Sequence, residues 1–271
     1  MNVKAVVKVM SFHALLHVES ARREAEKYRV MEKELFRMMG LILNNRNLQL
    51  DQKILAVNPD GPELCIYIGS DLGFCGAVNS SVAGKASDGA SADAIVMGKK
   101  IRRIPNQIFF TERENIEQRW DEVMEILADA VHRQKYSRIF LIYNHYHNMT
   151  SIECRRVQIF PIDMNKNRNP EQDEEAVDLK TVEQGDFVIT GDATNMLQNM
   201  TLTYLGLEIR MAAVSSFAAE NIARRNATTD SLKKIEEMEE QELWENRKER
   251  SQKAFKKVID SFIKKKSRGS D

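Results

Sequence analysis

The sequence predicts an α/β fold in which long N- and C-terminal helices form an antiparallel coiled coil, with a small α/β domain between them. From Met196 to Lys266 the chain has no proline and a single glycine, Gly206, so no residue obliges a helix to stop. The opposite end, Val3 to Asn47, also lacks proline and holds only Gly40. Between the two ends the apolar residues follow the shorter period of strands. We therefore expect three parts: an N-terminal helix at 1–48, a central domain at 49–192 and a C-terminal helix at 193–271.

The C-terminal helix is too long to pack only on the domain that precedes it. At ~1.5 Å per residue it would be on the order of 100 Å long, several times the width of a compact domain. Its first part, Leu202 to Ile222, is rich in apolar and small residues and is expected to pack on the domain and on the first helix. From Leu232 onward the apolar positions thin out among acidic and then basic residues. This pattern is typical of a solvated helix or of a shaft that lies within a larger assembly.

A seven-residue repeat runs through the first helix. One set of positions is entirely apolar: Val7, Ala14, Ala21, Tyr28, Leu35 and Ile42. The interleaved set is apolar in half of its members: Lys4, Ser11, Val18, Ala25, Glu32 and Met39. Together they predict a coiled-coil seam, and its alanines allow a second helix to approach closely.

Composition excludes several classes of protein. The 271 residues include 40 basic and 40 acidic side chains, so there is no basic excess for a nucleic acid. The three cysteines, Cys65, Cys75 and Cys154, form no CxxC pair. They fit a protein of a reducing compartment and indicate neither a disulfide framework nor a zinc site. No apolar run has the length of a signal or of a membrane span. We expect a soluble chain that is linked to a membrane only through partners.

The central part alternates strands with a helix, in a Rossmann-like arrangement. Predicted strands lie at Lys53 to Asn58, Leu64 to Gly69, Ala94 to Met97, Gln107 to Phe110, Arg138 to Tyr143, Ser151 to Phe160 and Phe187 to Thr190. Apolar residues at three- and four-residue spacings predict an amphipathic helix over Asn115 to Gln134. We expect a flexible loop over Gly84 to Asp93, and Asp192 or Thr194 as the cap of the C-terminal helix.

An enzyme hypothesis has to be tested at Ser70 to Val82, where a strand, a glycine-containing loop and an Asn/Ser helix start resemble a phosphate-binding turn. A P-loop needs a glycine five residues before Gly-Lys and a hydroxyl after it, whereas Gly84-Lys85 has Asn79 and Ala86 at these places. Two histidine pairs, His13 with His17 and His145 with His147, lack a third ligand at metal-binding spacing. We expect the second pair in a loop between two strands. No catalytic residue, cofactor or metal is predicted.

Several short sequence motifs along the chain, which we call words, resemble those of the gamma subunit of F-type rotary ATP synthases. Ser70 to Ser80, S-D-L-G-F-C-G-A-V-N-S, is similar to that family's S-D-R-G-L-C-G-x-x-N-S and is the most specific. Val6 to Met10 resembles I-T-K-A-M, and Asn246 to Arg250 is a loose version of N-x-x-R-Q. Tyr143-Asn144 and Phe160-Pro161 resemble Y-N-K-F…L-L-P, and Glu220 with Arg224 matches S-E-x-x-A-R. The words cover essentially the whole chain.

The resemblance implies a non-catalytic central-stalk subunit, a rotor shaft that couples rotation to ATP synthesis or hydrolysis at sites on the surrounding subunits. Its implied partners are the ring of alpha and beta subunits, an epsilon-like subunit and the membrane rotor ring. The implied location is peripheral, on the cytoplasmic side of the cell membrane. Residues carried over as facing the ring are Lys8, Met10, Glu220, Arg224 and Arg250.

The sequence also departs from the family. The chain begins almost at the I-T-K-A-M word, Leu72 replaces the arginine of S-D-R-G, and the domain's first helix is cut to the loop at Gly84 to Asp93. The tip, from Ala254 onward, is rich in lysine where the family has an apolar tip, and unpaired charge is costly to bury. These changes favour a divergent or paralogous member. They also leave open a second hypothesis, a gamma-like scaffold or adaptor that no longer rotates.

Overall fold

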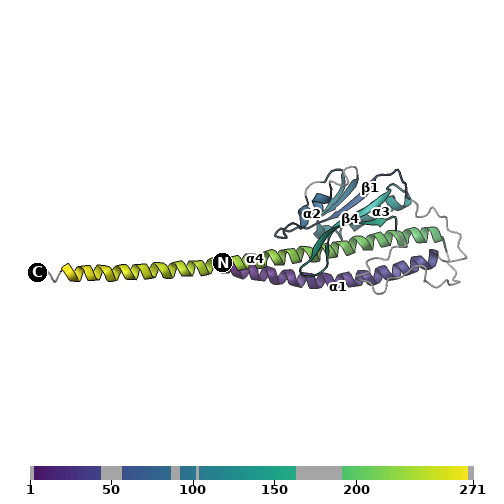
Figure 1. Ribbon diagram of the computed structural model, residues 1–271. Helices are drawn as coiled ribbons and strands as arrows, with labels where there is room; N and C mark the ends of the chain where they lie inside the picture. Colours follow the sequence, from purple (N-terminus) through teal and green to yellow (C-terminus); the bar gives the residue numbers. More distant parts are fainter. Residues whose placement is uncertain (1–2, 44–56, 87–91, 102–103, 163–190, 268–271) are drawn as a thin grey trace.

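The computed structural model describes residues 3–43, 57–86, 92–101, 104–162 and 191–267 (Figure 1). Its helices are α1 (Val3–Leu43), α2 (Val78–Gly84), α3 (Trp120–His132) and α4 (Ala193–Ser267), with a 3-10 turn, η2, at Arg113–Asn115. Its strands are β1 (Glu63–Ile68), β2 (Asp93–Met97), β3 (Gln107–Thr111), β4 (Arg138–Tyr146) and β5 (Ile152–Phe160). The predicted fold class, two long terminal helices with a mixed sheet between them, is confirmed.

The five strands form one sheet in the order β3-β2-β1-β4-β5. The first four are mutually parallel, and β5 runs antiparallel to β4 at one edge. The central strand β1 is buried along almost its whole length, as its continuous apolar run predicts. The four parallel strands therefore bring their carboxyl ends to the same edge of the sheet, which is where the site described below lies.

Helices α1 and α4 lie side by side in opposite directions (Figure 1). Lys4, near the start of α1, forms ion pairs with Glu236 and Glu239 of α4. Near the other end of α1, the ring of Phe36 lies 5.5 Å from that of Tyr204. The predicted seam faces inward: Ala14, Val18, Ala21, Leu35, Met39 and Ile42 are all buried. The seven-residue repeat is confirmed as the surface that joins the two helices.

The main apolar core joins the sheet, α3 and the first third of α4, and it includes Leu35 and Met39 of α1. Gly206 explains how α3 can pack so closely on α4. A Cβ at this position would lie 3.3 Å from Met124 Sδ and 3.3 Å from Trp120 Cζ2, so a larger residue would push α3 away. The only glycine of α4 therefore serves packing and does not end the helix.

Helix α4 has 75 residues, which at ~1.5 Å per residue corresponds to roughly 110 Å. It begins after Asp192, whose carboxylate accepts a hydrogen bond from the backbone N–H of Thr194 at 2.9 Å, so the predicted Asp192 cap is confirmed. From Glu236 to Ser261 every residue is exposed, and in Figure 1 α4 continues past the start of α1 and well beyond the domain. Large apolar side chains lie on it uncovered: Met238, Leu243, Trp244, Phe255, Val258 and Ile259.

Three predictions about individual elements are wrong in detail. His145 lies within β4 and not in a loop, because that strand continues to Tyr146 and pairs there with Ile152. Helix α3 begins at Trp120 and not at Asn115, because η2 and the residues after it turn more tightly. Gly84, predicted to start a loop, ends α2. The predicted strand at 187–190 and most of that at 53–58 lie outside the described residues.

Candidate functional site

Polar residues gather where the carboxyl ends of β1, β2 and β3 meet. Asp71 follows β1, and its two carboxylate oxygens accept backbone hydrogen bonds from the segments that follow the other two strands. The N–H of Lys99, after β2, donates at 2.8 Å, and the N–H of Glu114, after β3, donates at 3.2 Å. One side chain therefore holds three strand ends together.

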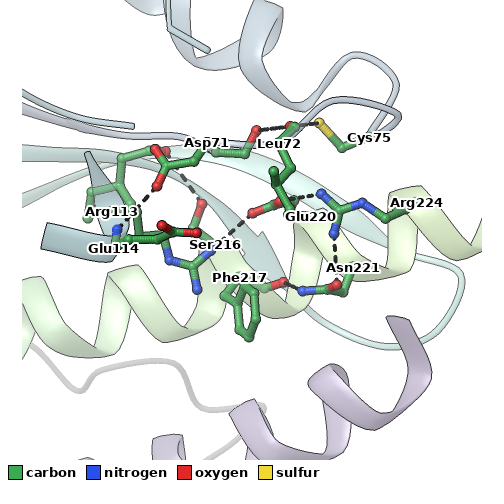
Figure 2. A network of polar contacts seen from close by, with 12 residues as sticks. Asp71, Leu72, Cys75, Arg113, Glu114, Ser216, Phe217, Glu220, Asn221 and Arg224 are labelled. Atoms are coloured by element: carbon green, nitrogen blue, oxygen red, sulfur yellow. Dashed lines mark hydrogen bonds and ion pairs between the residues drawn. The ribbon is translucent and has the colours of Figure 1, made fainter. Parts of the chain in front are cut away.

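Helix α4 passes this edge and contributes Glu220, whose side chain is 4% exposed. One of its carboxylate oxygens lies 3.0 Å from Nη1 of Arg113, which follows β3, and the other forms an ion pair with Arg224 one turn further along α4 (Figure 2). The guanidinium of Arg113 also stacks over the ring of Phe217, 3.7 Å from its centroid. We call Asp71, Arg113, Glu220 and Arg224 the joint, because they link the domain to α4.

Arg224 extends the joint to the loop at 70–76. Its Nε and Nη2 both donate to the carbonyl oxygen of Gly73, each at 3.4 Å. Inside the loop, the Ser70 hydroxyl donates to the carbonyl of Leu72 at 2.8 Å, and Asn79 Nδ2 donates to the Ser70 hydroxyl at 2.8 Å. The polar members of the S-D-x-G-x-C-G-x-x-N word thus brace the loop from within.

Leu72 and Phe74 point outward. They are the two residues at which S-D-L-G-F-C-G differs from the motif S-D-R-G-L-C-G that it resembles. Leu72 is 60% exposed and Phe74 is 77% exposed. Phe74 also has a φ of 60°, a left-handed conformation that is unusual for a bulky residue. The braced loop therefore presents two apolar side chains to the outside in a defined position.

Burial shifts the pKa values of several groups near the sheet. Desolvation lowers the pKa of the Arg113 guanidinium, while the negative charges of Glu220 and Asp71 act in the opposite direction. Desolvation also raises the pKa values of the Cys65 and Cys154 thiols, which makes their reactive thiolate forms rarer. At the far end of β4, desolvation lowers the pKa of His145 to about 4, helped by the charges of Arg155 and His147.

The chemistry of this edge is that of a structural connection. In open α/β sheets, ligands commonly bind outside the carboxyl ends of the strands. Here that position receives the side chains of α4, which bind the strand ends directly. Among the residues that the structure describes, no group of three His, Cys, Asp or Glu side chains is arranged to hold a metal ion. Within the same residues, none of the helices has both the length and the apolar character needed to cross a membrane.

The residues carried over as facing a ring fall into two groups. Glu220 and Arg224 are buried in the joint, with their charged groups turned toward the domain (Figure 2). Lys8 and Arg250 are exposed and Met10 is half-buried, all of them outside the joint. Asp71 and Arg113 were not predicted as members of the joint: Arg113 binds Glu220, and Asp71 holds the strand ends beside it. The available signal was their position, two or three residues after the end of a strand.

Comparison with known proteins identifies the family. A family model described as ATP synthase matches residues 1–258 of this chain. The ATP synthase gamma chain of Xylella fastidiosa (strain M23) is 21% identical over 254 residues, which cover 86% of this chain and 84% of that protein. The chain belongs to the ATP synthase gamma family. The resemblance read from the short sequence words is thereby confirmed.

Other members of the ATP synthase gamma family extend this similarity. The mitochondrial ATP synthase subunit gamma of Saccharomyces cerevisiae is 25% identical over 262 residues, covering 88% of this chain and 75% of that protein. A chain in the cryo-EM structure of the central stalk and c-ring of Tetrahymena thermophila mitochondrial ATP synthase superimposes with a TM-score of 0.56. That chain is 16% identical, and the match covers 83% of this chain and 99% of the other, so the gamma fold is shared.

Proposed function

We propose that this gamma-family chain is the central rotor shaft of an F-type ATP synthase or ATPase. It couples rotation to ATP synthesis or hydrolysis at sites on the surrounding subunits and performs no chemistry itself. The observation that carries the proposal is α4, a 75-residue helix of which the part from Glu236 to Ser261 is exposed. A helix of this length can act as a lever arm. Its packing on the domain through the apolar core allows it to transmit torque.

The uncovered part of α4 supports contact with other subunits. Trp244 is 62% exposed and Phe255 is 68% exposed, and large apolar side chains gathered on one surface commonly mark a protein interface. At ~100° per residue, Trp244, Phe255 and Ile259 lie on a side of α4 other than that of Glu236 and Glu239, which bind Lys4 of α1. This apolar side is therefore not a continuation of the seam with α1.

The proposed partners follow from the family. They are a ring of alpha and beta subunits around the shaft, an epsilon-like subunit and the rotor ring of the membrane, and the complex is peripheral on the cytoplasmic side. Lys8, Met10 and Arg250 are the proposed contacts with the ring, and the exposure of Lys8 and Arg250 supports this. That Glu220 and Arg224 also face the ring stays a prediction, since in this chain both bind the domain.

The second hypothesis, a scaffold that kept the fold and lost rotation, is not favoured by the family comparison, because the relatives reported above are gamma chains of ATP synthases. The scaffold hypothesis was motivated by the lysine-rich tip of the C-terminal helix. The last residues of this tip, 268–271, lie outside the described part of the chain. A rotor and a scaffold differ in one measurable respect, which is whether the chain must turn inside its ring during ATP turnover.

The test is a reversible crosslink in the assembled complex. Arg250→Cys places a thiol on the exposed part of α4, where a photoactivatable, disulfide-cleavable reagent can join it to a surrounding subunit. We expect ATP hydrolysis to stop on crosslinking and to recover on reduction, because a shaft fixed to its ring cannot turn. Turnover that continues in complexes shown to be crosslinked would support the scaffold and overturn the rotor.

The matched control is Gln107→Cys, an exposed position at the start of the edge strand β3. Crosslinks made there to subunits that turn with the shaft should leave turnover intact. Both variants carry Cys154→Ser, because that native cysteine is only half-buried, whereas Cys65 and Cys75 are buried.

A further inference from the structure

The contact between the domain and α4 changes character along the helix. From Leu197 to Ala212 the helix contributes apolar side chains to the main core. From Ser216 onward the contacts with the strand ends are polar: the Ser216 hydroxyl donates to the carbonyl of Ile68 at 3.4 Å, and the joint follows one turn later. The carboxyl edge of the sheet is therefore attached to α4 by directional polar contacts, together with the stacking of Arg113 on Phe217.

Glu220 is the residue that both sides of this attachment share. Arg113 belongs to the domain and Arg224 to α4, and each guanidinium binds a different oxygen of the same carboxylate. The joint holds two acidic and two basic residues, so its formal charge is balanced. Glu220 is nearly inaccessible to water, which means that loss of its charge would leave two partly buried cations close together.

Such an arrangement favours one geometry more than it adds stability. Desolvation of a buried ion pair offsets much of the attraction between its charges, so the pair is weak evidence for stabilisation. Removal of one partner is nevertheless costly, and the planar guanidinium accepts few alternative orientations around a carboxylate. As a result, the ion pairs hold the domain at one defined angle to α4 but add little to the free energy of unfolding.

We propose that Glu220 is a positioning residue that locks the carboxyl edge of the domain to α4, so that the domain and the shaft turn as one body. The torque part of this inference rests on the proposed rotor function, whereas the locking part concerns the chain alone. Glu220 acts through Arg113 on the segment after β3, and through Arg224 on the loop at 70–76. It thereby reaches two of the three strand ends, and Asp71 connects them to the third.

The first experiment measures hydrogen exchange in the full chain carrying Glu220→Gln. Glutamine keeps the shape of the side chain and removes its charge, so a residue that only fills space would tolerate the change. We expect amide exchange in the peptides covering 70–76 and 111–116 to become at least about tenfold faster, in line with the loss of charge-assisted hydrogen bonds. Exchange that stays at the wild-type rate in both peptides would overturn the proposal.

The matched control is Glu117→Gln. Glu117 also joins the domain to α4, through an ion pair with Arg210, but its side chain is 64% exposed. Screening by water makes such a pair weak, so we expect less than about a twofold change in the same peptides. Equal acceleration in both variants would mean that any domain–helix ion pair has this effect, and that Glu220 has no special role.

A second variant covers the case in which Glu220→Gln does not fold. In the double variant Arg113→Met with Glu220→Gln, one of the two unpaired cations is removed, so folding should recover. The same two peptides should still exchange fast, because the connection between the strand end and α4 is gone. Wild-type protection in the double variant would show that the joint does not hold these segments.

The second experiment tests torque in the assembled complex. With Glu220→Gln we expect a lower ratio of ion-driven ATP synthesis to ATP hydrolysis, and with Glu117→Gln no change in this ratio. Fast exchange without loss of coupling, in a complex that the Arg250→Cys crosslink does stall, would overturn the torque role of Glu220. A complex that the crosslink does not stall would overturn the rotor function itself, so the two failures are distinguishable.

Discussion

At the scale of single residues, His145 shows how burial decides a protonation state. Its Nδ1 lies 3.3 Å from the Ser215 hydroxyl of α4, and its Nε2 is buried without a hydrogen-bond partner among the described residues. Desolvation first, and then the positive charges of Arg155 and His147, lower its pKa to about 4, while Glu153 acts in the opposite direction. The imidazole is therefore neutral in the folded chain at neutral pH.

This pKa predicts how stability depends on pH. Between pH 6.5 and about 4 the unfolded chain binds a proton at residue 145 that the folded chain does not bind. The free energy of unfolding should therefore fall as the pH decreases through this window, and His145 should contribute no such change above it. Urea unfolding at a series of pH values measures the slope, and His145→Gln should make it shallower because glutamine does not titrate.

The control for this measurement is His132→Gln, because His132 is exposed at the end of α3. It makes the same change of side chain outside the sheet, so it separates the effect of the substitution itself from that of position 145. A His145→Gln protein with the full wild-type slope would show that another group dominates acid unfolding.

At the scale of elements, the seam between α1 and α4 depends on small residues. Ala14 is 1% exposed and Ala21 is 2% exposed, so the two backbones approach closely at these positions. The predicted repeat and the observed burial agree because burial of a seam depends on spacing along one helix, which is a local property. The large apolar residues of the same repeat, Leu35 and Met39, lie where the helices also meet the domain core.

Over-packing tests this seam. Ala21→Leu places three extra carbon atoms between the helices and should lower the free energy of unfolding by roughly 1–3 kcal/mol. Urea unfolding of the full chain measures the change. Ala5→Leu on an exposed position of α1 is the matched control and should lie within about 0.5 kcal/mol of the wild type. A more stable Ala21→Leu protein would mean that the helices can separate without loss, contrary to close packing.

At the scale of the whole molecule, support for α4 is uneven along its length. The first part is held by the domain and by α1, whereas the part from Glu236 to Ser261 is exposed on all sides. Most helical stability in proteins comes from tertiary packing, and segments with few buried contacts open at low free energy. The chain by itself should therefore be most labile where the proposed ring would cover it.

Limited proteolysis measures this difference. A protease specific for Lys and Arg should cut the isolated chain between Arg247 and Lys257 well before it cuts after Arg210 or Arg224, which are packed against the domain. Incorporation into the complex should protect the 247–257 segment, because the ring would cover it. Similar rates at all these positions would contradict the uneven support of α4.

Features that depend on neighbouring residues were determined by the sequence alone. They include the two long helices, the seam of α1, the Asp192 cap and most of the strands, because proline, glycine and the spacing of apolar residues act within a few turns of chain. The short words identify the gamma family for a related reason. Two of their polar residues, Ser70 and Asn79, bind one another although they lie nine positions apart, still within one short segment.

Only the tertiary structure decided how Asp71, Arg113, Glu220 and Arg224 combine. Glu220 and Arg224 are recognisable as a pair four apart on one helix, but their partners follow β1 and β3, about 110 to 150 residues earlier in the chain. The parallel order of the sheet brings those strand ends to one edge, and the packing of α4 across that edge adds Glu220. The polar residues of β4 show the same limit: Asn144 and His145 have the composition of a loop, yet they pair with β5 as a strand, and α2 and α4 supply partners for their side chains.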